Sequence, residues 1–237
     1  MSRNASAKPK PRGTLALVGG DEFAPECADF HRALLATADT DEVLVIPAAA
    51  AFEGPDAVVA RATEHFATLG AKVRALHVLS RRDADDDAVV RTAKHAKFVY
   101  LTDGSPMHLR SVLKDTQLYD VLVGAYRNGA VLAAAGAGAT VLCDPMIDPR
   151  GGAYTVGLGL VEQVAVFAHH RGGADHIWDR AVELLPHDAT LAGIDDHTAL
   201  VRDPEGAWTI VGAGTVTTCR AEGVLVRHGA GTVSFGV

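Results

Sequence analysis

Short apolar runs alternate with helix-length amphipathic segments along the first hundred or so residues of the chain. The apolar positions of the helical segments recur at roughly helical spacing, and each apolar run is of strand length. This alternation is typical of βαβ crossover units, which build a parallel sheet. The pattern predicts strands at residues 14–18, 43–46, 72–79 and 98–101, and helices at residues 25–38, 55–69 and 85–95.

The pattern changes after Pro145. An apolar run is followed by one helical segment and then by several short apolar runs separated by Gly and Asp, which mark turns. We expect these runs to form an antiparallel extension on one edge of the sheet, within a single domain of residues 13–237. The runs are 164–167, 191–194, 198–201, 208–211, 216–219 and 224–226, with the helix at 174–185.

Composition agrees with one large α/β domain. The 237 residues are 48% hydrophobic and 22% charged, which is enough for a sizeable core. The net charge is −7, and no segment concentrates Lys and Arg, so we expect no nucleic-acid partner. Residues 1–12 are basic and contain proline, and we predict a flexible tail there. The apolar run that follows is too short for a signal sequence or a membrane span, which predicts a cytoplasmic protein without membrane attachment.

The three cysteines, Cys27, Cys143 and Cys219, are far apart and form no CxxC pair, so we expect reduced, buried thiols. No cofactor motif is present, because the turn at residues 19–22 has neither a GxGxxG fingerprint nor a following Lys-Ser or Lys-Thr. Four histidines between residues 169 and 187, with two neighbouring aspartates, match no metal signature. We therefore predict no metal and interpret these side chains as the polar surface of a helix. They are His169, His170, His176 and His187, with Asp175 and Asp179.

Ligands of open parallel sheets bind outside the carboxyl ends of the strands. The loops at this edge are residues 19–23, 47–52 and 102–106, together with the turn at Gly136. Around Gly136 a buried apolar strand, a turn of very small residues and a short helix follow one another. This is the arrangement of the nucleophile elbow of serine hydrolases, although Gly136 has no side chain.

Five segments carry a family resemblance. Residues 13–20, 101–105, 129–146, 157–160 with His169, and 193–200 occur in the order and spacing of the cyanophycinase and dipeptidase E serine peptidases, and the likeness covers nearly the whole chain after residue 12. The resemblance implies the flavodoxin-like fold of class I glutamine amidotransferases, a three-layer α/β sandwich with a mostly parallel central sheet. The elbow of that family is approximately Gly-Thr-Ser-Ala-Gly-Ala, and alignment of Ala137-Gly138-Ala139 with its last three residues places Gly136 on the serine.

The resemblance also assigns roles to neighbouring positions. His169 matches the histidine of the family, whereas the flanking Phe167 and Ala168 replace polar residues. The pocket loop Thr102-Asp103-Gly104-Ser105-Pro106 stands where the family has approximately Thr-Gly-Gly-Asp-Gln. These matches make Gly136 and His169 the candidate catalytic positions and Gly104, Ser105 and Ala137 the candidate substrate-binding positions. No motif identifies an acidic partner of His169, for which Asp144 and Asp148 are the nearest candidates.

Glycine at an elbow keeps the backbone amides that would hold an oxyanion, but it lacks the attacking atom. The changes at the pocket loop and beside His169 point in the same direction. We therefore favour a catalytically degenerate homologue that binds a small peptide, an amino acid or a protein partner in the old crevice. A homodimer is compatible with the sequence.

The alternative is an active hydrolase of aspartyl-type peptide or amide bonds. It would use Ser105, or a water activated by His169, in place of the elbow serine. A serine directly before Pro106 is more often the N-cap of a helix, and we favour that interpretation. A glutamine amidotransferase-like subunit is excluded, because that chemistry needs a cysteine at the elbow.

Overall fold

The computed structural model describes residues 13–170, 175–220 and 223–234. Its centre is a sheet of eight strands, of which five pair in parallel with one another and three are added by antiparallel pairing. The parallel strands are β1 (Leu15–Val18), β2 (Glu42–Ile46), β3 (Lys72–Ala75), β4 (Phe98–Leu101) and β5 (Val131–Ala135). The antiparallel strands are β12 (Thr198–Arg202), β13 (Trp208–Gly212) and β16 (Gly231–Val233). The order across the sheet is β16-β13-β12-β1-β5-β4-β2-β3.

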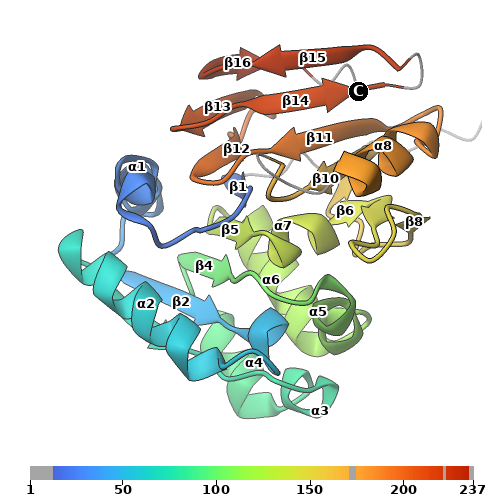
Figure 1. Cartoon of the computed structure of the whole chain (residues 1–237). Coiled ribbons are helices and arrows are strands. Elements are labelled where there is room, and N and C mark those ends of the chain that lie inside the picture. Colours follow the sequence, from blue (N-terminus) through green and yellow to red (C-terminus); the bar gives the residue numbers. More distant parts are fainter. Residues whose placement is uncertain (1–12, 171–174, 221–222, 235–237) are drawn as a thin grey trace, which may run out of the picture.

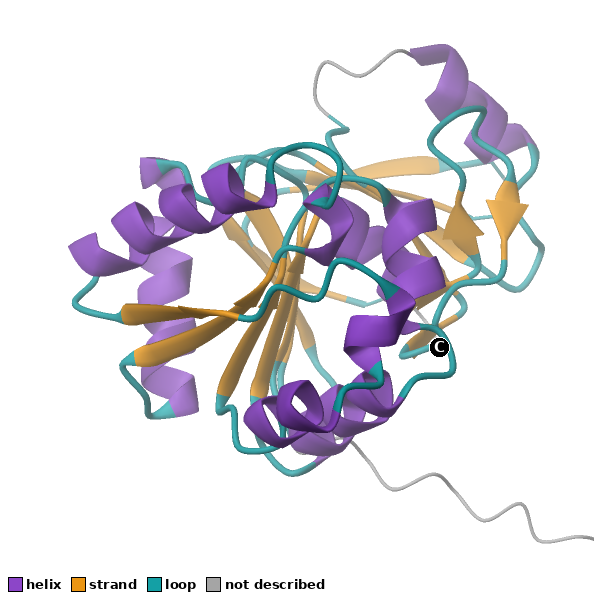
Figure 2. Cartoon of the chain, turned by 90° about the horizontal axis from the view of Figure 1, so that it is seen from below, coloured by secondary structure: helices purple, strands orange, loops and turns teal. Residues whose placement is uncertain are grey.

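Helices cover both faces of this sheet, as Figure 2 shows. On one face α1 and α2 contribute Phe30, Leu34 and Phe66 to a core cluster that also contains Val45 and Tyr100. On the other face, residues of α3 to α7 pack against the alternate strand residues. The strands are therefore apolar on both sides, as expected of a buried parallel sheet. The helices are α1 (Ala28–Ala38), α2 (Pro55–Thr68), α3 (Arg81–Ala84), α4 (Asp87–Ala93), α5 (Pro106–Leu113), α6 (Gln117–Arg127) and α7 (Ala137–Leu142).

A second sheet lies beside the first in the C-terminal third of the chain (Figure 1). It has the order β10-β11-β14-β15, and β10 and β11 are parallel whereas the other pairs are antiparallel. The helix α8 (Asp175–Glu183) lies between β10 and β11 in the sequence. The strands are β10 (Val164–Phe167), β11 (Thr190–Ile194), β14 (Val216–Cys219) and β15 (Leu225–His228), and two further short pairs are β6 (Cys143–Asp144) with β9 (Val161–Glu162) and β7 (Met146–Ile147) with β8 (Tyr154–Thr155).

The predicted α/β architecture, with a mostly parallel sheet and an antiparallel C-terminal extension, is confirmed. The structure adds that the extension divides between two sheets. The helix expected at 85–95 is α4, which is shorter than predicted. It begins at Asp87, because the Asp86 carboxylate caps it by accepting hydrogen bonds from the N–H groups of Ala88 (2.7 Å) and Val89 (3.3 Å). The third strand ends at Ala75, earlier than predicted.

The three cysteines are buried and none of them forms a disulfide. Cys143 lies at the end of α7 and begins β6. No helix among the described residues has both the length and the apolar character required to span a bilayer.

Candidate functional site

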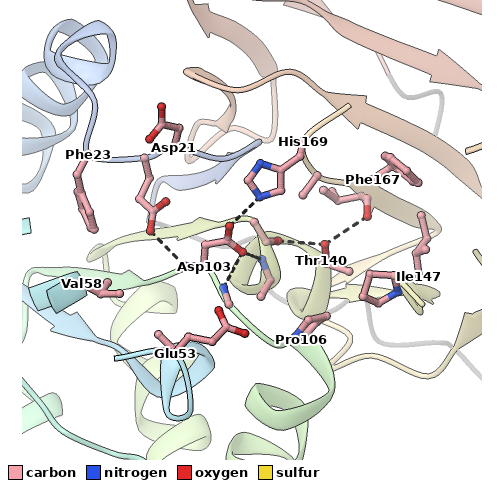
Figure 3. A pocket seen from close by; sticks show the side chains of 18 of the residues that line it. Asp21, Phe23, Glu53, Val58, Asp103, Pro106, Thr140, Ile147, Phe167 and His169 are labelled. Carbon is pink, nitrogen blue, oxygen red and sulfur yellow. Dashed lines mark hydrogen bonds and ion pairs between the residues drawn. The ribbon is translucent and has the colours of Figure 1, made fainter. Parts of the chain in front are cut away.

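A cavity of about 550 Å³ opens at the carboxyl ends of the parallel strands (Figure 3). Segments far apart in the sequence form it, and four of them follow strands. The loop after β1 contributes Asp21 to Ala24, the loop after β4 contributes Asp103, Gly104 and Pro106, the turn after β5 contributes Gly136 and Ala137, and the segment after β10 contributes Ala168 and His169.

Gly136 forms the sharp turn between β5 and α7. Its backbone has φ 50° and ψ −109°, a conformation that residues with a Cβ atom rarely adopt. Its N–H donates to the carbonyl of Val18 (3.0 Å), which fixes the turn against the end of β1. The chain therefore has a sharp strand-to-helix elbow, and glycine adopts this backbone conformation easily because it has no side chain.

The carboxylate of Asp103 lies directly over this elbow. Its Oδ1 accepts hydrogen bonds from the backbone N–H groups of Gly104 (2.7 Å) and Ala137 (2.7 Å). A Cβ atom built on Gly136 would overlap Oδ1 and Cγ of Asp103. The carboxylate thus occupies the space of a side chain at position 136 and also uses the two amides that flank that space.

His169 lies between two carboxylates. Its Nε2 is 2.7 Å from Oδ2 of Asp103, and its Nδ1 is 2.7 Å from Oδ1 of Asp196. The backbone N–H of His169 donates to the carbonyl of Gly19 (2.9 Å), which ties the segment after β10 to the loop after β1. The imidazole therefore bridges the central sheet and the second sheet at the cavity.

These contacts determine the protonation states of His169 and Asp103. The hydrogen bond that His169 donates to Asp103, followed by the negative charges of Asp103 and Asp196, raises the pKa of His169 to about 9 against the opposing effect of burial. Burial acts to raise the pKa of Asp103, but the hydrogen bond and charge of His169, with the two backbone amides, outweigh it and leave that pKa lowered. At neutral pH the pair is an imidazolium and a carboxylate, and a protonated imidazole has no lone pair with which to act as a base.

The rest of the cavity has an acidic side and an apolar side. Glu22 is buried, with 6% of its surface exposed, and its Oε1 accepts the N–H of Asp103 (3.2 Å). Burial, followed by the charge of Asp103, raises the pKa of Glu22. Asp21 and Glu53 line the cavity near it, together with the cation of Arg61. Apolar residues line the remainder of the wall, among them Pro106, Ile147, Phe167, Ala168 and Ile177.

Four of the five residues expected in the site line this cavity: Gly104, Gly136, Ala137 and His169. Ser105 does not. Its hydroxyl accepts the N–H of His108 (3.3 Å) and caps α5, as the preferred interpretation of the sequence held.

Sequence reasoning missed the two carboxylates that contact His169. Asp144 and Asp148, the nearest candidates, were wrong, because Asp144 accepts the N–H of Gly157 (3.3 Å) and Asp148 pairs with Arg150 (2.6 Å). A signal for Asp103 was present, since an acidic residue stands there where the resembling family has glycine. Asp196, 27 residues after His169, had no such signal outside the motif at residues 193–200.

The histidines considered for a metal do not gather. His169 contacts two carboxylates, whereas the His170 ring packs on Trp178 with 4.2 Å between ring centroids. Within residues 13–170, 175–220 and 223–234, no three His, Cys, Asp or Glu side chains are placed to hold a metal ion.

Comparison with known proteins identifies the family. The model of peptidase family S51 matches residues 15–210. The chain belongs to peptidase family S51. The cyanophycinases of Nostoc sp. and Trichormus variabilis are each 28% identical to it over 213 residues, which is 85% of this chain and 71% of each relative.

Solved structures agree with this assignment to family S51. A peptidase from an acI-B1 Actinobacterium superimposes with a TM-score of 0.85 at 29% identity, over 95% of this chain and 98% of that one. A putative peptidase E protein from Listeria monocytogenes has a TM-score of 0.62 at 17% identity, over 88% and 98% of the two chains, and shares the fold. The resemblance inferred from the sequence is therefore confirmed at the level of the family.

Proposed function

We propose that this S51 chain has lost serine-type hydrolysis and uses its crevice to bind a small peptide or amino-acid ligand. The proposal places Gly136 at the position of the family's nucleophilic serine. One observation carries it: the Asp103 carboxylate occupies both the side-chain space above Gly136 and the N–H groups of Gly104 and Ala137.

A serine peptidase needs three things at this point: a hydroxyl, a neutral histidine that accepts its proton, and free backbone donors for the oxyanion. Position 136 has no hydroxyl. His169 is held protonated by its carboxylate neighbours. The backbone donors of Gly104 and Ala137 already bind a carboxylate. Each of the three requirements is unmet, and Asp103 accounts for two of them.

The cavity itself favours a ligand that carries a positive group. Asp21, Glu22 and Glu53 outnumber Arg61 on the acidic side, which suits an ammonium or guanidinium group. The apolar side fits the carbon skeleton of the ligand. The volume of about 550 Å³ lies in the range of small-molecule sites. The names of the curated relatives, cyanophycinases, support a peptide-like ligand.

Ser105 gives little support to the alternative of an active hydrolase. Its hydroxyl is engaged at the start of α5 and lies outside the set of residues that line the cavity. A water activated by His169 would meet a histidine that is already protonated.

Purified protein incubated with aspartyl dipeptides and with β-aspartyl-arginine tests both parts of the proposal. We expect no release of product, and we expect calorimetry to detect binding of at least one of these compounds. Glu22→Gln should weaken that binding, whereas Asp29→Asn, on the exposed side of α1, is the matched control and should leave it unchanged. If the natural chain hydrolyses these compounds and His169→Ala abolishes that turnover, the proposed loss of hydrolysis is contradicted. If no compound binds, the proposed ligand site is contradicted.

A further inference from the structure

We propose that Asp103 is a nucleophile toward small apolar alkyl electrophiles, and that His169 and Asp196 complete the set of groups that hydrolyses the resulting ester. This activity goes beyond the proposed ligand binding and does not depend on it. Carboxylate side chains form covalent intermediates in other enzymes, so the chemistry is available to an aspartate in a suitable site.

The two oxygens of Asp103 have different environments. Oδ1 is bound by two backbone N–H groups at 2.7 Å, whereas Oδ2 contacts Nε2 of His169, and both residues line the cavity. Figure 3 shows the carboxylate and the imidazole pointing toward one another in direct contact. If Oδ2 is alkylated, Oδ1 becomes the carbonyl oxygen of an ester and already lies in a pair of amides suited to an oxyanion.

The groups needed for the second step are also in place. Asp196 holds Nδ1 of His169 at 2.7 Å, which fixes the ring with Nε2 toward Asp103. The His169 side chain is 47% exposed, so water reaches it. The ester carbon would therefore have a water-accessible imidazole beside it.

The wall beside this carboxylate suits an apolar substrate. Phe167 and Ala168 stand at positions where the resembling family is polar, and Ile147, Pro106 and Ile177 extend the apolar surface. A neutral alkyl compound loses less hydration free energy on entering such a wall than a charged one does. The substrate class is therefore a small primary alkyl halide or a similar neutral alkyl compound with an anionic leaving group.

In the first step Oδ2 forms a bond to the alkyl carbon, and the halide leaves with the electron pair of the carbon–halogen bond. The ester is uncharged. Because the Asp103 hydrogen bond and charge are what chiefly hold the proton of His169, alkylation lowers the pKa of His169 and the proton passes to solvent. The base is thus freed by the first step.

In the second step His169 takes a proton from water while the water oxygen bonds to Cγ of Asp103. The oxyanion forms on Oδ1, within reach of the N–H groups of Gly104 and Ala137. Collapse breaks the bond from Cγ to Oδ2, and the alcohol leaves with Oδ2 and the proton from His169. The new carboxyl group of Asp103 then gives its proton to His169, which restores the carboxylate and the imidazolium. The net change converts alkyl halide and water to alcohol, halide and a proton, and Asp103 retains one oxygen from water.

Mass spectrometry of the chain treated with n-butyl bromide tests the proposal. In His169→Gln the second step is blocked, so one butyl group should accumulate on Asp103. The Asp103→Asn/His169→Gln variant should carry none there. Asp21 is the internal control, because it lines the cavity and contacts His197 at 2.7 Å but has no pair of backbone donors, and it should remain unlabelled.

The natural chain provides a second readout that does not depend on a variant. In heavy-oxygen water it should release bromide and gain the heavy isotope in the Asp103 carboxylate. Asp196→Asn should slow bromide release over repeated turnovers more than it slows the first alkylation.

The proposal is overturned if His169→Gln gains no butyl group on Asp103 although a thermal melt shows that this variant is folded. It is also overturned if Asp21 is labelled to the same extent as Asp103. It is overturned equally if the natural chain gains no isotope. These readouts concern a carboxylate adduct, so they are distinguishable from the peptide assays that test the proposed function.

Discussion

A pair of histidines in the core and a single histidine in the crevice are held in opposite protonation states. His31 is completely buried in the core between α1, α2 and β4, where Nδ1 lies 2.8 Å from Nε2 of His65 and Nε2 lies 3.2 Å from the hydroxyl of Tyr100. Burial, followed by the neighbouring His65, holds the pKa of His31 well below its usual value. His169 is nearly half exposed, lies between two carboxylates and has a pKa of about 9.

The difference shows what decides the charge of a histidine in this fold. Among neutral partners, a buried imidazole stays neutral and serves packing and hydrogen bonding. Among carboxylates, an accessible imidazole stays charged and orients them. The chemistry of the crevice therefore depends on Asp103 and Asp196 as much as on His169, and the core cluster has no comparable carboxylate contact.

The largest effect should follow from filling the space above the elbow. Gly136→Ala places a methyl group on Asp103 and imposes a disfavoured backbone conformation, so we expect a loss of about 3 kcal/mol in the free energy of unfolding. In an Asp103→Gly background only the backbone strain remains, and the loss should fall by about half. Urea unfolding of the single and double variants measures this coupling.

Gly124→Ala is the matched control, because Gly124 lies within α6 and an added Cβ there meets nothing within 4 Å. It should be neutral or stabilising. If Gly136→Ala lowers the free energy of unfolding equally in both backgrounds, Asp103 does not restrict the side chain at position 136. The same coupling predicts that Gly136→Ser alone restores no peptidase activity, whereas any gain requires Asp103→Gly as well.

The second effect concerns acid stability and the core cluster. The folded-state pKa of His31 lies below its unfolded value of 6.5, so the unfolded chain binds the proton more readily. The stabilisation is present above pH 6.5 and is lost as the pH falls from there toward the folded pKa, by about 1.4 kcal/mol per pH unit. The lowered pKa of His65 acts in the same direction.

Urea unfolding at a series of pH values below neutrality measures that slope. Tyr100→Phe removes the hydroxyl but not the burial, so it should lower stability at every pH, by about 2 kcal/mol, and leave the slope in place. A flat acid profile would contradict a neutral buried His31.

The third effect is a loss of stability at alkaline pH, and it concerns His169 in the crevice. The folded-state pKa of His169 lies above 6.5, so its stabilisation is full below pH 6.5 and is lost as the pH rises through about 9. Because nearly half of the side chain is exposed and solvent screens the pair, we expect a loss of roughly 1 kcal/mol. Asp103→Asn should remove most of this alkaline loss, and titration of His169 near pH 6.5 by NMR would contradict the ion pair.

Local patterns predicted most of the scaffold. Strands such as β1 and β4 are apolar at every position because helices cover both faces, and such runs are visible in the sequence. The partners of the C-terminal strands were not predictable in this way. β12 and β14 are similar in length, yet one extends the central sheet and the other joins the second sheet.

The site was predictable where it follows from one segment. Gly136 and His169 could be found from the small-residue turn and from the family motif. The contact between Asp103 and the elbow could not, since it depends on a loop after β4 meeting the turn after β5, 34 residues later. A carboxylate beside glycines is also an ordinary loop residue, so only the folded structure distinguishes its role.

The smallest effect distinguishes Ser105 from its neighbour Asp103. Ser105→Ala removes an N-cap that makes one long hydrogen bond, so we expect a loss of about 0.5 kcal/mol. Asp86→Ala is the matched control, because Asp86 caps α4 with two hydrogen bonds and should lose more, about 1 kcal/mol. Ligand binding and alkylation of Asp103 should be unchanged in Ser105→Ala. If that variant unfolds normally but loses either property, the hydroxyl acts in the cavity, and the crevice depends on a serine after all.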